Sequence, residues 1–217
     1  MRIGILFDLD GTLLDTLQDL QDSVNHALEV FGFPRRSYEE VRSFVGNGAA
    51  QLIRQAVPAD CDEAMTASVL AEFRRHYDDN CRNKTQPYPG ILQALEEVRG
   101  LYPTAIVSNK PDSAVKELCS IYFPGVYALG ETSGCPRKPA PDMVFKAMGE
   151  LDVDSCVYVG DSEVDVLTAR NAGVPCLSVL WGFRDRPELA AAGGSCFCGN
   201  TRDLPGIIRR LAESIGK

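Results

Sequence analysis

The stretch IGILFDLDGTLLDT, residues 3–16, decides how the rest of the chain is organised. Its apolar beginning, Ile3 to Phe7, predicts a buried parallel strand, which ends in two acids one residue apart followed by Gly-Thr. Residues i and i+2 share one face of a strand, so Asp8 and Asp10 would hold two like charges close together unless a cation or a reacting group lies between them. This crowding favours a functional site at the carboxyl end of the strand, although a surface Asp-x-Asp-Gly turn contains the same residues.

Composition and charge narrow the function classes. The chain has 217 residues, of which 45% are hydrophobic, enough for a sizeable core. The formal net charge of −8 disfavours nucleic acid and anionic membranes as partners, and no basic patch offsets it. Asp8 and Asp10 interrupt the apolar run near the N-terminus, and no apolar stretch approaches the roughly 18 residues of a membrane span. We therefore expect a cytoplasmic protein, monomeric or homodimeric, without nucleic-acid or membrane partners.

The eight cysteines have no metal-ligand spacing. They are scattered singly apart from Cys196 and Cys198, and no Cys-x-x-Cys is present. In a reducing compartment such residues are usually small core side chains, so we expect neither disulfides nor a zinc site.

The periodicity of apolar residues predicts an α/β protein with a helical insertion. After Thr16 the period changes from strand to helix, and helices are expected over 17–31, 38–44, 49–57 and around 69–77, the second opened by a capping box at residues 37–40. From Ile91 onward helices and strands alternate; strands are expected over 104–107, 126–129, 156–159 and 176–180, and a last helix over 203–215. This order predicts a doubly wound parallel-sheet (Rossmann-like) core, residues 1–14 and 88–217, with an inserted all-helical cap, residues 15–87. The Pro/Gly stretch 86–90 is suited to a hinge.

Three further polar groups follow core strands or precede helices. Ser108 and Asn109 could donate to an anion after the strand 104–107, and Ser108 could also cap the next helix. Lys138 lies between prolines that restrict its backbone. Asp161 follows the strand 156–159, and Asp165 lies at the start of the next helix. Asp161 beside Asp8 would form an oxygen-rich site for a hard cation such as Mg²⁺.

The segment DLDGT, residues 8–12, resembles the first motif of the haloacid dehalogenase-like hydrolases, whose phosphatases carry Asp-x-Asp-x-Thr. Ser108, Lys138 and the Gly-Asp-x-x-x-Asp run of residues 160–165 match the three other motifs in the same order. The resemblance implies that Asp8 is the nucleophile and Asp10 the general acid and base. It also implies that Mg²⁺ is bound by Asp8, by Asp161 and through the backbone carbonyl of Asp10. The phosphate-binding residues expected from this assignment are Thr12, Ser108, Asn109 and Lys138.

Charge counting also favours a divalent cation. Four aspartates, residues 8, 10, 161 and 165, would face one lysine, Lys138, before any phosphate arrives. We expect Asp165 to orient Lys138 or metal-bound water rather than to bind the metal directly.

The resemblance separates some branches of the family. Asp10 argues against the dehalogenases, which need no proton donor for a halide, and the absence of lysine between residues 15 and 83 argues against the phosphonate-cleaving branch. Residues 44–50 and 168–175 look most like the phosphoglycolate phosphatase branch. In the cap, Gly46, Asn47 and Gly48 could approach a small anionic substrate, or could form a plain helix-breaking turn.

The sequence therefore predicts a Mg²⁺-dependent phosphatase that hydrolyses a small phosphomonoester, phosphoglycolate-like, through an aspartyl-phosphate. Four alternatives remain open: a pyrophosphatase, a sugar-phosphate phosphatase, a phosphomutase, or a non-catalytic phosphate-binding regulatory protein on the same fold.

Overall fold

The chain forms two compact units in a computed structural model that describes residues 1–215. One unit comprises Met1–Leu14 and the chain from Pro87 onward, and the other comprises Asp15–Gln86. The boundary expected from the sequence lies one residue later, after residue 87.

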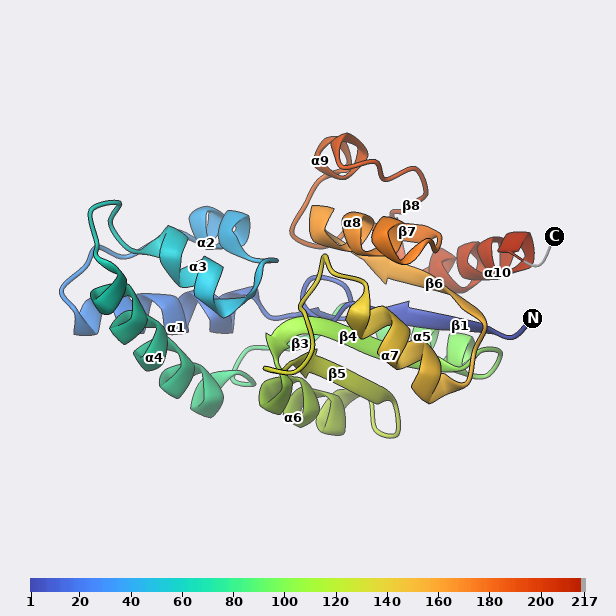
Figure 1. The fold of residues 1–217 in the computed structure, drawn as a ribbon, viewed down its shortest axis with the longest axis horizontal. Helices are drawn as coiled ribbons and strands as arrows, with labels where there is room; N and C mark the ends of the chain where they lie inside the picture. Colours follow the sequence, from blue (N-terminus) through green and yellow to red (C-terminus); the bar gives the residue numbers. More distant parts are fainter. Residues whose placement is uncertain (216–217) are drawn as a thin grey trace. The chain divides into compact units, whose positions relative to one another are not determined.

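The first unit is an α/β fold around one parallel sheet (Figure 1). The strands follow the order β5-β4-β1-β6-β7-β8, and every neighbouring pair is parallel. The strands are β1 (Ile3–Phe7), β4 (Thr104–Pro111), β5 (Tyr127–Glu131), β6 (Ser155–Gly160), β7 (Cys176–Val179) and β8 (Phe197–Cys198). The helices are α5 (Ile91–Arg99), α6 (Asp112–Tyr122), α7 (Asp142–Leu151), α8 (Glu163–Ala172), α9 (Arg186–Ala191) and α10 (Leu204–Ile215), with a 3₁₀ turn, η1 (Thr201–Asp203), before α10. The predicted doubly wound parallel core is confirmed.

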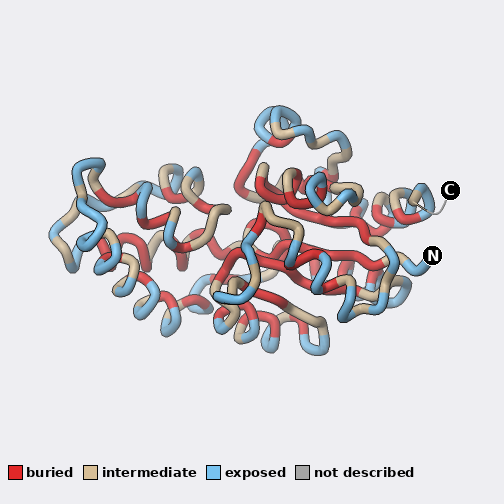
Figure 2. Tube along the Cα trace, in the orientation of Figure 1, coloured by how far each residue is buried: buried red, intermediate tan, exposed pale blue. Residues whose placement is uncertain are grey.

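The central strands are buried because helices cover the sheet (Figure 2). Leu6, Val107 and Tyr158 pack with α7 and α8 in one buried cluster. Helices α5 and α10 pack against each other, and α10 also packs on β6. Both faces of such a strand are buried, so it reads as a continuous hydrophobic run rather than as an alternating pattern.

The register of the central strands brings three polar loops together. Phe7, the last residue of β1, is paired with Ile106 of β4 and with Val159 of β6. The segments that follow these three residues therefore reach the same edge of the sheet, where doubly wound folds bind ligands.

The second unit contains four helices: α1 (Leu17–Val30), α2 (Tyr38–Phe44), α3 (Gly48–Ala56) and α4 (Glu63–Asn80). Helix α1 packs against the other three around a core that includes Val24 and Phe73. The expected capping box opens α2, where Ser37 and Glu40 each accept a hydrogen bond from the other's backbone N–H. The carboxylate of Asp19 accepts the backbone N–H groups of Lys84 and Thr85, which ties the end of this unit to α1.

The structure differs from the sequence-based expectations at several connections. Short strands β2 (Leu14–Asp15) and β3 (Gln86–Pro87) pair where the chain passes from one unit to the other. Strand β4 runs to Pro111, beyond its expected end at 107. Helix α6 then begins at Asp112 with Pro111 at its N-cap, so the expectation that Ser108 caps this helix is wrong. The elements α9 and β8 were not expected.

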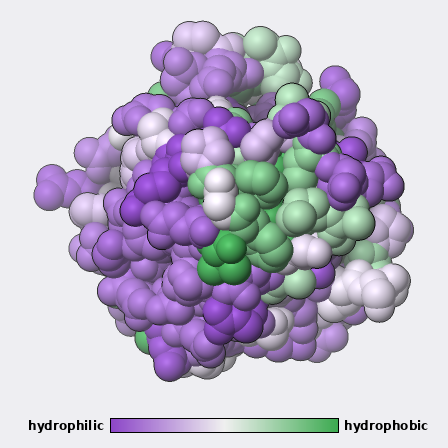
Figure 3. Space-filling model, turned by 90° about the vertical axis from the view of Figure 1, so that its left-hand side faces the viewer, coloured by the Kyte–Doolittle hydropathy of each residue, from purple (hydrophilic) through white to green (hydrophobic). Residues whose placement is uncertain are grey.

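The surface carries few large apolar side chains. In the helical unit Val30 and Met65 are among them, with 57% and 40% of their surface exposed. The face drawn in Figure 3 is mostly hydrophilic around one compact apolar patch. Among the described residues, no helix has both the length and the hydropathy required of a membrane span. All eight cysteines are free thiols.

Candidate active site

Three carboxylates from β1, β6 and α8 meet at the carboxyl edge of the sheet. Asp8 directly follows β1, and its N–H donates to Val159 O in β6 at 2.8 Å, which aligns it with the end of that strand. One oxygen from each of Asp8, Asp161 and Asp165 lies within 4.8 Å of the others. All three residues are buried. The sequence placed these acids at strand and helix ends, and the structure brings them together.

Lys138 joins this carboxylate cluster from the loop before α7. Its Nζ lies 2.8 Å from Asp8 Oδ1 and 2.8 Å from Asp165 Oδ1, and only 2% of the side chain is exposed. Burial by itself would lower the pKa of Lys138, but the carboxylates of Asp165 and Asp8 outweigh it and hold that pKa well above its ordinary value. The lysine is therefore a permanent positive charge between two acids.

The remaining negative charge at the site is poorly compensated. Burial raises the pKa of Asp8 to about 7, with Asp165 and Asp10 adding to the rise and Lys138 opposing it. Burial, followed by the nearby Asp165 and Asp8, also raises the pKa of Asp161 well above its usual range. Carboxylates that resist ionisation for these reasons are the donor set that a hard divalent cation fits, because the cation removes the repulsion and oxygen is its preferred ligand.

Asp165 uses its oxygens within the protein. Its Oδ2 accepts from Ser162 Oγ at 2.6 Å, from Ser162 N at 3.1 Å and from Asp161 N at 3.2 Å. Its Oδ1 accepts from Lys138 Nζ at 2.8 Å and from Tyr158 Oη at 3.3 Å. Both oxygens of Asp165 are thus engaged with Lys138, Tyr158 and the start of α8.

Asp161 is held by two segments that are distant in sequence. Thr12 Oγ1 donates to its Oδ1 at 3.1 Å, and Phe183 N donates to its Oδ2 at 2.7 Å. Trp181 Nε1 donates to Thr12 O at 3.0 Å, so the loop after β7 supports both partners. A Cβ at Gly182 would lie well inside 3.0 Å of Asp161 and of Gly11 O, so only glycine fits there. Sequence reasoning missed this loop and expected the Thr12 side chain on phosphate.

The Asn109 side chain, expected on phosphate, contacts the backbone of Lys138. Its Oδ1 accepts Lys138 N at 2.8 Å, and its Nδ2 donates to Lys138 O at 2.9 Å. Both ends of the side-chain amide thus hold the backbone of the lysine instead of pointing at a ligand. Ser108 is 2% exposed, and its Oγ accepts Lys110 N at 3.3 Å, which leaves its hydroxyl hydrogen for another acceptor.

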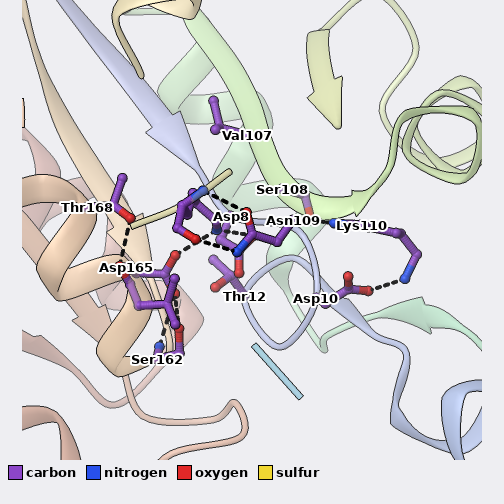
Figure 4. Close-up of polar contacts among 12 residues, drawn as sticks. Asp8, Asp10, Thr12, Val107, Ser108, Asn109, Lys110, Ser162, Asp165 and Thr168 are labelled. Atoms are coloured by element: carbon purple, nitrogen blue, oxygen red, sulfur yellow. Dashed lines mark hydrogen bonds and ion pairs between the residues drawn. The ribbon is translucent and has the colours of Figure 1, made fainter. Parts of the chain in front are cut away.

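Asp10 lies apart from the carboxylate cluster, beside a lysine that sequence reasoning missed. Lys110 Nζ is 2.7 Å from Asp10 Oδ1, and the pair lies to one side of Asp8 and Asp165 (Figure 4). The charge count made from the sequence was therefore incomplete, because a second lysine reaches the site. The only signal was its position directly after Ser108 and Asn109.

The glycine loop of the helical unit separates α2 from α3. Gly46 and Gly48 have φ values of 128° and 78°, which side chains rarely adopt, and Asn47 is the N-cap of α3 without a side-chain hydrogen bond. The loop is therefore a turn that depends on glycine.

Comparison with proteins of known sequence agrees with the motifs. The phosphoglycolate phosphatase of Rhodobacter capsulatus is 33% identical over 215 residues, covering 96% of this chain and 97% of the relative. Phosphoglycolate phosphatase 1 of Pseudomonas aeruginosa is 32% identical over 222 residues, covering 97% of this chain and 81% of the relative.

Comparison with solved structures also finds a protein named as a phosphoglycolate phosphatase. A crystal structure from Lactobacillus delbrueckii subsp. bulgaricus, provisionally named a phosphoglycolate phosphatase, superposes with a TM-score of 0.90 at 36% identity, covering 96% of this chain and 99% of that one. The family model described as haloacid dehalogenase-like hydrolase matches residues 5–179, which include all four motifs. The chain therefore belongs to the haloacid dehalogenase-like hydrolase family.

Proposed function

We propose that this protein is a Mg²⁺-dependent phosphatase that hydrolyses a small, phosphoglycolate-like phosphomonoester through an aspartyl-phosphate on Asp8. The observation that carries the proposal is the contact of Asp8 Oδ1 with the buried ammonium of Lys138, next to Asp161 at the carboxyl edge of the sheet. A nucleophile that must approach an anion needs fixed positive charge beside it. The names of the relatives support the substrate class.

The reaction proceeds in two displacements. In the first, a carboxylate oxygen of Asp8 attacks phosphorus, the bond from phosphorus to the ester oxygen breaks, and Asp10 gives its proton to that oxygen. In the second, a water molecule gives a proton to the Asp10 carboxylate as its oxygen attacks phosphorus. The bond from phosphorus to Asp8 then breaks, which releases phosphate and restores both aspartates.

Asp8, Asp161 and the backbone carbonyl of Asp10 would hold the Mg²⁺ ion. When bound, the ion supplies positive charge that neutralises the carboxylates and polarises the phosphoryl group. The charges of the described side chains fit one such ion. When Asp8, Asp10, Asp161 and Asp165 are all ionised, Lys110 and Lys138 offset two of the four charges, which leaves two negative charges.

The remaining site residues divide into two roles. Ser108 and Lys138 contact the phosphoryl oxygens, because the serine has a hydroxyl hydrogen to donate and the lysine an ammonium. Thr12, Asn109 and Asp165 act on other protein groups: Thr12 holds Asp161, while Asn109 and Asp165 hold Lys138.

The helical unit acts as the cap that selects the substrate. The loop formed by Gly46, Asn47 and Gly48 is the part of the cap that approaches the small anionic substrate, and a cap that closes over the site would exclude water during attack. The net charge of −8 supports a small phosphorylated metabolite as partner rather than nucleic acid or a membrane. We place the protein in the cytoplasm, as a monomer or homodimer.

A panel of phosphate compounds tests the proposal. Phosphate release from 2-phosphoglycolate, glycerol phosphate, a sugar phosphate, a nucleoside monophosphate and pyrophosphate is compared by kcat/KM, with and without a chelator. We expect Mg²⁺-dependent turnover with the highest kcat/KM for 2-phosphoglycolate, and no turnover by Asp8→Asn. A higher kcat/KM for pyrophosphate or a sugar phosphate would show that the substrate belongs to that class and is not phosphoglycolate-like. A folded protein that hydrolyses none of the compounds would contradict the proposal.

A further inference from the structure

Lys110 forms the second buried ion pair of the site. It lies within β4, and its Nζ is 2.7 Å from Asp10 Oδ1, although the two residues are 100 positions apart in the sequence. Only 3% of the lysine side chain and 14% of the aspartate side chain are exposed. Ion pairs on protein surfaces have little effect, but an ammonium this well buried is costly unless its partner stays in place.

A buried cysteine of α6 lies near the pair. Cys119 of α6 is 4% exposed, and burial, reinforced by the negative charge of Asp10 and opposed by Lys110, raises the pKa of its thiol to about 12. The thiol is therefore neutral. Cys119 therefore adds no charge that would compete with Lys110 for the Asp10 carboxylate.

The two lysines divide the site into two halves. Lys138 forms ion pairs with Asp8 and Asp165, whereas Lys110 forms an ion pair with Asp10 (Figure 4). The contact with Lys110 Nζ is the ion pair that the Asp10 carboxylate makes, and it holds Oδ1 of that carboxylate. Because Lys110 occupies Oδ1 of Asp10, the other carboxyl oxygen, Oδ2, is the one that can carry the proton.

We propose that Lys110 is the positioning residue of Asp10: its ammonium fixes the carboxyl group where Oδ2 gives a proton to the leaving oxygen and later takes one from water. This inference rests on the proposed function, since it assumes that Asp10 is the acid and base of a phosphatase. Lys110 neither gains nor loses a proton in either displacement, so the balance of protons transferred through Asp10 is unchanged by its charge.

The dependence on the leaving group tests this role. An alkoxide leaves only with a proton, whereas 4-nitrophenolate leaves without one, and kcat/KM reports the steps up to departure of the leaving group. Lys110→Met removes the charge and keeps the volume. We expect its kcat/KM to fall about 10- to 100-fold for an alkyl phosphate such as 2-phosphoglycolate, which is part of the roughly 100- to 10,000-fold that general acid catalysis contributes. For 4-nitrophenyl phosphate the fall should be less than about 3-fold.

The second displacement gives an independent readout. It needs Asp10 as a base whatever the leaving group was, so Lys110→Met should slow the release of phosphate from the enzyme. With 4-nitrophenyl phosphate we expect a rapid burst of one nitrophenolate per active site, followed by a slow steady state. A residue that only supports the fold would lower the burst amplitude together with every rate.

Matched variants serve as controls. Lys116→Met removes an exposed lysine of α6, paired with Asp112 four residues earlier, and should leave both substrates unchanged. Lys110→Arg keeps the charge and should restore most of the alkyl phosphate activity. Asp10→Asn combined with Lys110→Met should be no slower than Asp10→Asn alone, because the lysine acts only through the aspartate.

The outcomes separate this inference from the proposed function. If the wild type releases no phosphate from any ester, the proposed function is wrong. If the wild type is active but Lys110→Met loses equally on both substrates, or loses nothing, Lys110 does not position Asp10. Should Lys110→Met fail to fold, Lys110→Gln, which is neutral but keeps a hydrogen-bond donor, is compared with Lys110→Arg on the same two substrates, with the same criterion.

Discussion

A single methyl group added at Gly182 should disturb the proposed metal site. A Cβ at this position would lie well inside 3.0 Å of Asp161 Cβ, Asp161 Oδ2 and Gly11 O, and two of these contacts involve groups that cannot rotate away. Gly182→Ala must therefore displace Asp161 or the Gly11 backbone and stretch the bond from Phe183 N to Asp161. Overpacking of this kind costs about 1–3 kcal/mol.

The magnitude can be measured in two ways. For a chain of this size each kcal/mol lowers Tm by about 2–4 °C, so Gly182→Ala should melt about 2–12 °C below the wild type. The rise in Tm on adding Mg²⁺ should also shrink, because Asp161 no longer stands in its ligand position. Gly149→Ala is the control: nothing lies within 4 Å of its Cβ on α7, and alanine favours the helix by about 1 kcal/mol. A Gly182→Ala protein with wild-type Tm and an unchanged Mg²⁺ response would refute this account of the loop.

Three further predictions concern the charges and their supports. Burial raises the pKa of Asp8 from 3.8 to about 7, so the folded state binds the proton more tightly; this contribution to stability is complete below pH 3.8 and is lost as the pH rises through 7. The unfolding free energy of the metal-free wild type, measured with denaturant relative to Asp8→Asn, should therefore fall between pH 5 and pH 8, and a flat difference would contradict the assignment. Asn109→Ala breaks both hydrogen bonds to the Lys138 backbone and should lower kcat/KM at least about 10-fold, whereas Asn83→Ala, which breaks an exposed bond to Asn80, should not change it. Asp165→Asn leaves the Lys138 ammonium with one carboxylate and should cost about 3–5 kcal/mol in denaturant unfolding; a loss as small as that of Asp22→Asn, which breaks an exposed pair with Lys84, would show that Asp165 does not hold the lysine.

The core strands and the site residues at their carboxyl ends could be predicted from the sequence. An apolar run followed by acids identifies a parallel strand and its carboxyl edge, and parallel strands of a doubly wound sheet present those ends together. Asp8, Asp161 and Lys138 could therefore be expected at one site before any distance was known, and the structure brings them together.

The supporting contacts could not be predicted in the same way, because they depend on register and loop conformation. Lys110 lies in a strand where a lysine is usually exposed, and only the pairing of β1 with β4 brings it to Asp10. Both ends of the Asn109 amide face the Lys138 backbone, a geometry with no local pattern.

The missed elements differ in how well the sequence marked them. Strand β8 has two residues, too few for a period. Helix α9 did carry a local signal, since Asp185 and Glu188 form a capping box with a proline in the first turn. That signal could have identified the helix, although it gives no hint of the contacts that residues 181–183 make with Thr12 and Asp161.

The central claim is that Asp8 carries the phosphoryl group during turnover. It is tested most directly by mixing the enzyme with Mg²⁺ and a phosphate-labelled ester, quenching with acid within the first turnover and locating the label by mass spectrometry. The account predicts a hydroxylamine-sensitive phosphoryl group on Asp8 that forms and decays at rates compatible with kcat and is absent from Asp8→Asn. Phosphate release by the wild type without any labelled protein, or with the label on another residue, would contradict it.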